Sequence, residues 1–413
     1  KDSMGIWKKV KERLGKFCEK VIEVGIGEKF ENNGCDQYII SNNVEDYYRL
    51  FSEKRLGNIT KILHLPTLTQ TKEVDGIADL EHKLDFGVYS LFHIVKAIKK
   101  NNFTNNIDII VVTRNANEVT GDEELICPEN ATLFGLTKVI KQEVDNINCK
   151  CVDIDTHTDI EKVILDIWTS MDCFQEAYRD GLRYIQVLKH AEIDSFNIED
   201  VKVKKDGVYI ITGGRGGIGL EISRYLAAQN NINLAIINRS KFPDRIDWDQ
   251  ILESNKDSEL CKRISKLKEI ESKGTNVLIY SCDVSDIDGM QHIVNKLVQQ
   301  FKKINGIIHC AGIEEFKPII SMDYDRFKSI IAPKVFGTWV LNHVTQAEEI
   351  DFFIMFSSIA SVFGFPLQGS YAAANSYMDS FSSYYNKMGK KGLSINWPAW
   401  KETGMATKYG DRL

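Results

Sequence analysis

The stretch Gly207-Val-Tyr-Ile-Ile-Thr-Gly-Gly-Arg-Gly-Gly-Ile-Gly219 decides the fold of this chain. Its β-branched and aromatic residues predict a short buried strand, and that strand ends abruptly in glycines. The residues that follow, Leu220-Glu-Ile-Ser-Arg-Tyr-Leu-Ala-Ala228, have a helical pattern. A strand, a tight glycine turn and a helix bring backbone N–H groups and a helix N-terminus against a pyrophosphate. Glycine is needed in such a turn because a side chain would block the phosphate and because the backbone angles are unusual.

The length and composition are those of an ordinary globular protein. The chain has 413 residues, enough for two or three domains, of which 43% are hydrophobic and 27% are charged. The formal net charge of −6 argues against a nucleic-acid surface. A lysine cluster near the start is interpreted as a solvated helix face, formed by Lys8, Lys9, Lys11, Lys16 and Lys20.

Other classes of protein are excluded by what the sequence lacks. No apolar stretch is long enough to span a membrane, and the N-terminus has no secretory-signal pattern. The nine cysteines have no metal-binding spacing, since Cys149-Lys-Cys151 is too tight for a zinc pair and no second pair stands nearby. We therefore expect reduced thiols, no metal site and a cytoplasmic location.

Strand-like and helix-like segments alternate throughout, which predicts α/β architecture with largely parallel sheets. In the first half we expect strands near Lys20–Gly25, Lys61–Leu65, Ile107–Val112 and Lys150–Ile154, and helices over Val44–Ser52, Leu80–Lys99, Ala131–Val144 and Ile160–Met171. In the second half we expect strands at Val208–Thr212, Asn233–Asn238, Val277–Ser281, Gly306–His309, Phe352–Ser357 and Leu393–Trp397.

The polar segment Glu192–Lys205 predicts a boundary between two domains, at residues 1–200 and 201–413. The first half has no counterpart of the glycine turn, because its strand at Lys61–Leu65 runs on into Pro66-Thr-Leu-Thr69. We expect the first domain to be a packing partner without a cofactor, and the second to carry the chemistry.

The glycine turn fits T-G-x-x-x-G-x-G, the spacing of short-chain dehydrogenases, with the residues Thr212, Gly213, Gly214, Arg215, Gly216, Gly217, Ile218 and Gly219. The next expected strand ends in Asn238-Arg239-Ser240, without the carboxylate that would bind the ribose hydroxyl of NAD. Arg239 and Arg215 would instead bind a 2′-phosphate, so we expect NADPH. The alternative is that Arg239 is a surface charge.

Two further strand ends complete the expected cofactor site. Asp283 and Val284 follow a strand, where an acid could accept a hydrogen bond from the adenine amino group. Ala311 and Gly312 follow another, and such small residues permit a close approach to the cofactor.

A third stretch carries candidate catalytic groups. Ser357 and Ser358 end a strand at the sheet edge that binds ligands, and Tyr371 opens a helix thirteen residues after Ser358. An unassisted tyrosine has a pKa of about 10, so it needs a nearby cation to donate its proton reversibly near neutral pH. Asn375 stands four residues after Tyr371, where most short-chain dehydrogenases have lysine, and Lys334 lies 37 residues before Tyr371.

This exchanged lysine and asparagine resembles the ketoreductase domains of modular polyketide synthases. Trp397-Pro-Ala-Trp400 and Glu402-Thr-Gly-Met405 are similar to segments of that family beside the nicotinamide. In the first half, Pro128–Lys138 and Glu176–Tyr184 are similar to its structural subdomain. The resemblance covers nearly the whole chain.

The resemblance implies two Rossmann-like subdomains: a truncated structural one, and a catalytic one with a parallel sheet. It implies NADPH-dependent reduction of a (β-)ketoacyl thioester on an acyl carrier protein, among neighbouring synthase domains and without nucleic acid or membrane. Tyr371 would donate the proton and Ser358 would hydrogen-bond the carbonyl oxygen. Lys334 and Asn375 would orient the cofactor ribose, the tyrosine and the proton path.

The family's markers of product stereochemistry are absent. Ile313-Glu-Glu-Phe316 stands where a Leu-Asp-Asp motif marks one alcohol configuration, and Phe363 stands where a tryptophan marks the other. Without the aspartate we expect the L-hydroxyl (A-type) product. The family continues past Gly404 with a lid helix, a further helix and a strand, whereas this sequence ends at Leu413.

Two other functions are compatible with parts of the pattern. One is a stand-alone reductase of free ketones, for which the first half would serve no purpose. The other is a non-reducing domain that binds carrier or cofactor as a scaffold. Such domains normally lose the tyrosine, the asparagine or the glycine turn, all of which are present here.

Overall fold

The computed structural model describes residues 6–34, 36–69, 72–190, 202–254, 258–401 and 403–404. Its contacts divide the chain into two compact units. The first unit consists of Lys1–Leu188, Glu315–Lys328 and Ala360–Tyr384, and the second of Lys189–Glu314, Ser329–Ile359 and Tyr385–Leu413. The expected boundary segment, 192–205, lies largely outside the described residues. Within the described ranges, no helix is long and apolar enough to cross a membrane.

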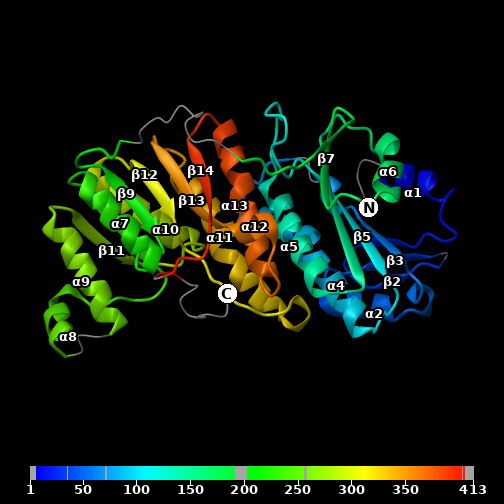
Figure 1. Ribbon diagram of the computed structural model, residues 1–413, viewed down its shortest axis with the longest axis horizontal. Coiled ribbons are helices and arrows are strands. Elements are labelled where there is room, and N and C mark those ends of the chain that lie inside the picture. Colours follow the sequence, from blue (N-terminus) through cyan, green and yellow to red (C-terminus); the bar gives the residue numbers. More distant parts are fainter. Residues whose placement is uncertain are drawn as a thin grey trace. The chain divides into compact units, whose positions relative to one another are not determined.

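The second unit is built on a six-stranded parallel sheet (Figure 1). The strand order is β11-β10-β9-β12-β13-β14. Successive strands are therefore added first on one side of β9 and then, from β12 onward, on its other side. Such sheets open a ligand-binding crevice at this change of side. All six strands lie within one residue of the predicted bounds: β9 (Val208–Thr212), β10 (Asn233–Asn238), β11 (Asn276–Ser281), β12 (Gly306–His309), β13 (Phe352–Ser358) and β14 (Gly392–Trp397).

Helices cover this sheet on both faces. Tyr209 and Ile211 of β9 share a core with residues of α7 and α9, while the alternate residues Val208 and Ile210 are equally buried. Burial on both faces explains the continuous apolar runs of the strands. The helices of this part of the chain are α7 (Gly217–Gln229), α8 (Trp248–Ser254), α9 (Glu259–Ser272), α10 (Ile287–Phe301) and α11 (Tyr324–Val344), whose first residues, up to Lys328, belong to the first unit.

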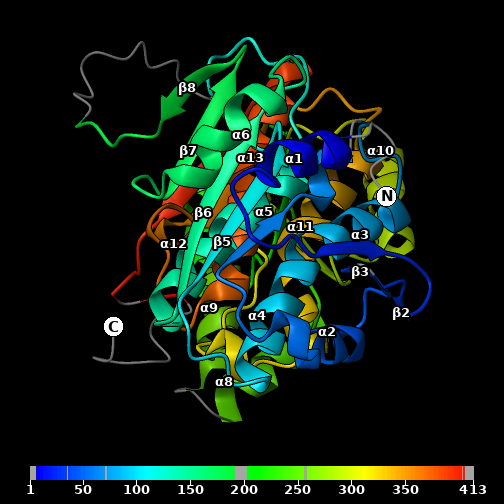
Figure 2. The same cartoon turned by 90° about the vertical axis from the view of Figure 1, so that its right-hand side faces the viewer.

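The first unit contains a five-stranded sheet in the order β4-β5-β6-β7-β8 (Figure 2). The first four strands are parallel and β8 is antiparallel to β7: β4 (Lys61–His64), β5 (Ile107–Arg114), β6 (Ile147–Ile154), β7 (Gln175–Arg179) and β8 (Leu182–Ile185). A small sheet precedes it, in the order β1-β3-β2, from β1 (Glu23–Ile26), β2 (Glu31–Asn32) and β3 (Gln37–Ile40).

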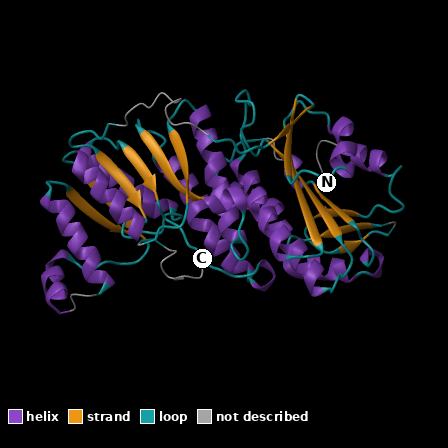
Figure 3. Cartoon of the chain, in the orientation of Figure 1, coloured by secondary structure: helices purple, strands orange, loops and turns teal. Residues whose placement is uncertain are grey.

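Helices and strands alternate along the chain in this unit as well; Figure 3 colours the helices purple and the strands orange. Val10 and Leu14 of α1 pack with the buried face of α6 on β5 and β6. The helices of the unit are α1 (Ile6–Leu14), α2 (Val44–Ser52), α3 (Ile77–Leu84), α4 (Ser90–Lys100), α5 (Pro128–Glu143), α6 (Ile160–Thr169), α12 (Ile359–Phe363) and α13 (Gly369–Lys387), of which α12 begins, and α13 ends, in the second unit.

One predicted helix is wrong as a continuous element. The expected helix over Leu80–Lys99 is interrupted by a π turn at Asp85–Tyr89, because Gly87 has non-helical angles (φ −91°, ψ −108°). A side chain would restrict that conformation, whereas glycine permits it.

A buried ionic cluster lies at the carboxyl ends of β5 and β6 in the first unit. Asp153 accepts hydrogen bonds from the Thr113 hydroxyl (2.7 Å) and the Ala116 N–H (2.8 Å), and its second oxygen pairs with Arg179 at 2.7 Å. Glu123 accepts from three successive backbone N–H groups at 119–121 and from Arg179 at 2.9 Å. Backbone N–H groups that could bind a phosphate here are therefore bound to the chain's own carboxylates.

This cluster predicts an acid-sensitive contribution to stability. Burial raises the pKa of Glu123, but backbone N–H groups and Arg179 outweigh it, and the pKa falls from 4.5 to about 2. Since the unfolded chain protonates this carboxylate first, the contribution is complete above pH 4.5 and is lost as the pH falls toward 2. Urea unfolding at about pH 6 and about pH 3 should show a smaller acid-induced loss in Glu123→Gln than in wild type. Glu124→Gln, at an exposed position, should retain the full loss; equal losses in all three proteins would contradict the prediction.

Candidate cofactor and active site

The glycine turn after β9 is shaped by close backbone approaches. Gly213 has φ +69°, and a Cβ there would lie 2.8 Å from the Ala311 nitrogen. A Cβ at Gly219 would lie 2.7 Å from the Gly213 oxygen, and one at Gly217 would lie 2.6 Å from the Gly404 nitrogen. The chain therefore needs glycine at these positions to keep its own backbone in place as well as to admit a phosphate.

The turn leads directly into the N-terminus of α7. Gly216 is the N-cap, and the first turn of the helix contains no acidic residue. Free backbone N–H groups and the helix dipole favour an anion at such an end. Thr212, Gly214 and Ile218 complete the turn, and the Thr212 hydroxyl lies 2.6 Å from His309 Nδ1 at the end of β12. The predicted residues are thus assembled in a form that fits a pyrophosphate.

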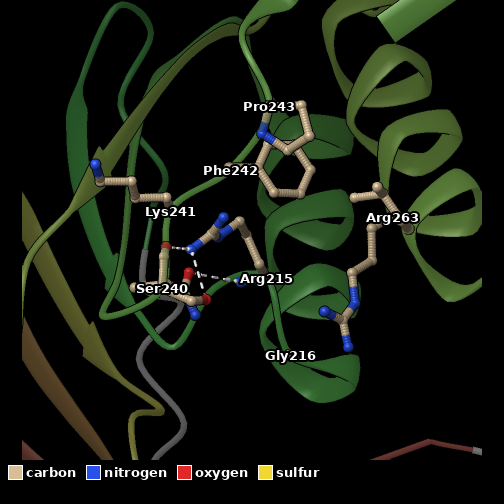
Figure 4. Close-up of a pocket in the computed structure, with 9 residues that line it drawn as sticks. Arg215, Gly216, Ser240, Lys241, Phe242, Pro243 and Arg263 are labelled. Carbon is tan, nitrogen blue, oxygen red and sulfur yellow. Dashed lines mark hydrogen bonds between the residues drawn. The ribbon is translucent and has the colours of Figure 1, made fainter. Parts of the chain in front are cut away.

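A cavity of about 390 Å³ lies next to the turn, at the end of β10 (Figure 4). Three cationic side chains line it, those of Arg215, Lys241 and Arg263. None of the nine residues that line it is acidic; the others are Gly216, Asn238, Ser240, Phe242, Pro243 and Leu260. A cavity with positive charge and no carboxylate is suited to a phosphate group.

Arg215 is held in place from several sides. Only 4% of it is exposed, and its guanidinium donates to the Ser240 carbonyl and lies 3.3 Å from the Ser240 hydroxyl. It stacks over the Phe242 ring at 4.7 Å, and its backbone N–H donates to Asn238 at 3.1 Å. Burial lowers the pKa of Arg215, and repulsion from the Arg263 guanidinium lowers it further. The two guanidiniums therefore repel each other, and an anion bound beside them would offset this repulsion.

Arg239 lies elsewhere. It does not line the cavity; its side chain is 69% exposed, and its guanidinium is 4.0 Å from the Asp283 carboxylate. Asp283 also accepts from the Ser285 N–H and hydroxyl, at 3.0 Å and 2.7 Å. Val284 is buried, and a Cβ at Gly337 of α11 would lie 2.6 Å from it.

Lys334 is buried at the carboxyl ends of β12 and β13. Its ammonium donates to the Phe356 carbonyl at 2.6 Å, two residues before Ser358. Its stem fills the space beside Gly312, where a Cβ would lie 2.7 Å from Lys334 Cε. The preceding carbonyl, of Pro333, is 3.0 Å from His309 Nε2. Lys334, Gly312 and Ser358, predicted separately, therefore lie around neighbouring strand ends.

Tyr371 and Asn375 belong to the first unit, on α13. Tyr371 is 7% exposed and Asn375 is fully buried. The Asn375 amide donates to the Tyr371 carbonyl at 2.7 Å, as expected for positions i and i+4 of a helix. Lys334 and Ser358 belong to the second unit, so the structure places the four catalytic candidates as two pairs, one pair in each unit.

Residues 207–402, which include parts of both units, match the KR domain model. This segment, just under half of the chain, is a ketoreductase (KR) domain. Residues 2–170 match a second model, described as β-ketoacyl synthase-like, N-terminal. A KR domain is an oxidoreductase that acts on keto groups.

Solved structures and curated relatives agree with this family. The ketoreductase is similar to the crystal structure of an N-terminal ketoreductase from the macrolactin assembly line, with 28% identity, a TM-score of 0.79, and coverage of 99% of this chain and 79% of the other. It is 26% identical over 375 residues to 6-methylsalicylic acid synthase of Penicillium patulum, covering 88% of this chain and 20% of that protein. It is 31% identical over 282 residues to polyketide synthase PksN of Bacillus subtilis (strain 168), covering 66% of this chain and 5% of that protein. The chain thus spans a fifth or less of each of these two curated relatives.

Sequence reasoning missed five residues that line the ketoreductase's cationic cavity: Lys241, Phe242, Pro243, Leu260 and Arg263. Lys241 and Phe242 directly follow the predicted Ser240, so their position after β10 was an available signal. Arg263 lies on α9 and reaches the cavity only through the packing of that helix. Of the predicted segment Glu402-Thr-Gly-Met405, residues 402 and 405 lie outside the described residues.

Proposed function

We propose that this ketoreductase uses NADPH to reduce the keto group of a (β-)ketoacyl thioester to a hydroxyl during polyketide biosynthesis. The substrate would be carried by an acyl carrier protein, and neighbouring synthase domains would supply and receive it. The observation that carries the cofactor assignment is the cavity lined by Arg215, Lys241 and Arg263 beside a glycine turn. The polyketide synthase PksN among its relatives supports the substrate class.

NADPH would lie with its pyrophosphate on the glycine turn and its 2′-phosphate in the cationic cavity. Arg215 can donate through its guanidinium, and Ser240 and Asn238 offer polar groups at the same edge. Arg239 could add a further cation from the exposed side, while Asp283 and Val284 would border the adenine. Ala311 and Gly312 would leave room for the ring system near Lys334. When bound, NADPH supplies the hydride that adds to the carbonyl carbon.

The side chains would stabilise and then neutralise the negative charge that develops on the carbonyl oxygen. Tyr371 would donate its proton to that oxygen, and the Ser358 hydroxyl would hydrogen-bond it. Lys334 would favour the phenolate left on Tyr371, because a nearby ammonium stabilises a negative charge. Asn375 would hold the helix and the proton path around Tyr371. The product is an alcohol: one hydride on carbon and one proton on oxygen.

We also propose that the two parts of the chain have different roles. Residues 1–200 would form the structural subdomain without a cofactor, and residues 201–413 the NADPH-binding subdomain. The saturated N–H groups around Glu123 and Asp153 support the first part of this proposal.

The test is consumption of NADPH with a β-ketoacyl N-acetylcysteamine thioester, followed by chiral analysis of the product. We expect turnover and the L-hydroxyl product. Turnover of free ketones with no preference for the thioester would favour a stand-alone reductase. Binding of NADPH without any turnover would favour a scaffold.

Arg215→Ala should change the choice of nucleotide. A lost hydrogen bond to a charged group costs about 1.5–3 kcal/mol, so KM for NADPH should rise at least about tenfold while KM for NADH stays nearly constant. Arg263→Ala should act in the same direction, and Arg239→Ala less, since Arg239 is largely exposed. Arg224→Ala, on the exposed side of α7 where it pairs with Glu221, is the matched control. Equal losses for the two nucleotides would overturn the assignment of the cavity.

A further inference from the structure

Glu143, the last residue of α5, bridges two distant segments of the first unit. One carboxylate oxygen accepts from the Ile319 N–H at 2.7 Å, and the other accepts from the Leu367 N–H at 2.6 Å. Leu367 stands four residues before Tyr371 and two before the start of α13. A single carboxylate therefore fixes the backbone on the approach to the proposed proton donor.

Two more side chains of α5 hold the same approach. Lys138 donates to the Ser361 carbonyl at 2.5 Å. The Gln142 amide lies 3.3 Å from the Phe363 and Gly364 carbonyls. Lys138 and Gln142 are i and i+4 neighbours, so they lie on one face of α5. This face, with Glu143 at its end, binds the backbone of the segment 361–367 at successive points.

The held segment is strained at Leu367. Its φ of +71° lies in the left-handed region, which leucine rarely adopts. Its N–H is bound by Glu143, and its carbonyl accepts from the Lys317 N–H at 2.9 Å. Such a conformation persists only where its surroundings enforce it. Just beyond it, a Cβ at Gly369 would lie 2.7 Å from Ile319, so the start of α13 is packed against the other segment that Glu143 binds.

We infer that Glu143 is a positioning residue for the reduction: it fixes the backbone at Leu367, at the end of the segment 361–367, and thereby the start of the helix that carries Tyr371. The inference rests on the proposed function for its consequence in catalysis. The hold on the backbone can be measured without any substrate. Glu143 can hold both segments alone, because it has one carboxylate oxygen for the Ile319 N–H and one for the Leu367 N–H.

Hydrogen exchange gives the first test, on the full chain. Glutamine at position 143 keeps the shape but offers one acceptor oxygen and an NH₂ group in place of two acceptors. Glu143→Gln should speed exchange at least about tenfold, the equivalent of about 1.4 kcal/mol, at whichever of the Ile319 and Leu367 amides then faces the NH₂ group, because only one of the two keeps an acceptor oxygen. Gln142→Ala, a milder variant, should leave both amides protected. The matched control is Glu124→Gln, which removes an exposed carboxylate from the same unit. Unchanged protection in Glu143→Gln would overturn the inference.

Kinetics separate positioning from a merely structural role. In Glu143→Gln we expect kcat with the thioester to fall at least about fivefold and the stereochemical purity of the alcohol to drop, with NADPH affinity within about twofold of wild type. Adding Leu367→Gly, which adopts φ +71° without strain, should recover most of the lost kcat. A parallel loss of NADPH affinity, melting temperature and kcat would overturn the positioning role. If wild type itself reduces no thioester, the proposed function fails, and the exchange experiment still decides whether Glu143 holds this segment.

Discussion

Tyr371→Phe is expected to lower kcat for thioester reduction by ~10²–10⁴-fold, the usual contribution of a general acid. The variant removes one oxygen and the transferable proton while keeping the ring, and Tyr371 is only 7% exposed, so its packing should be retained. Stopped-flow or steady-state NADPH oxidation with a ketoacyl thioester measures the change. KM for NADPH and the melting temperature should stay close to those of wild type, because the phenol would act only in the chemical step.

The control for this variant is on the same helix. Tyr384→Phe makes the same chemical change 13 residues further along α13, at a partly buried position, and it should leave kcat nearly unchanged. If Tyr371→Phe and wild type reduce the thioester at equal rates, Tyr371 is not the proton donor. The roles proposed for the other three catalytic candidates, which depend on that proton transfer, are then overturned as well.

The strands of the second unit could be predicted closely because each is a short apolar run bounded by glycine or polar residues. Burial on both faces makes such runs continuous, so their ends are visible in the sequence. In the first unit the hairpin of β7 and β8 was missed, although Asp180-Gly181, both with positive φ, is a typical hairpin turn. The interruption at Gly87 was missed because an isolated glycine in a helical pattern is usually tolerated.

The residues of the site also fall into those that the sequence predicts and those that it cannot predict. The glycine turn, Asn238 and Ser240 follow strand ends, and parallel strand ends converge at one edge whatever the details of packing. Arg263 could not be predicted, since its place at the cavity depends on how α9 packs against α7 and β11. The contacts of Glu143 are equally hidden, because they join α5 to backbone groups at 319 and 367, and sequence patterns carry no information on such distant partners.

Gly135→Ala should be the most disruptive small substitution in the first unit. A Cβ at Gly135, in the middle of α5, would lie 2.5 Å from the Ala372 carbonyl carbon and 2.6 Å from the Ala373 nitrogen. These are backbone atoms of α13, so neither can turn aside as a side chain could. Glycine in a helix interior costs about 1 kcal/mol relative to alanine, yet the chain keeps it here because it lets the two helices touch.

We therefore expect Gly135→Ala to destabilise the fold by about 1–3 kcal/mol, the usual cost of overpacking, despite its better helix propensity. Because Ala372 directly follows Tyr371, the shift of α13 should also lower kcat more than it raises KM for NADPH. Urea unfolding and thioester kinetics measure the two effects. The control is Gly76→Ala, where a Cβ would meet nothing within 4 Å and the backbone is extended. A Gly135→Ala protein as stable and as active as wild type would show that α5 and α13 do not need this close approach, and that the first unit does not hold the tyrosine helix in the way its contacts indicate.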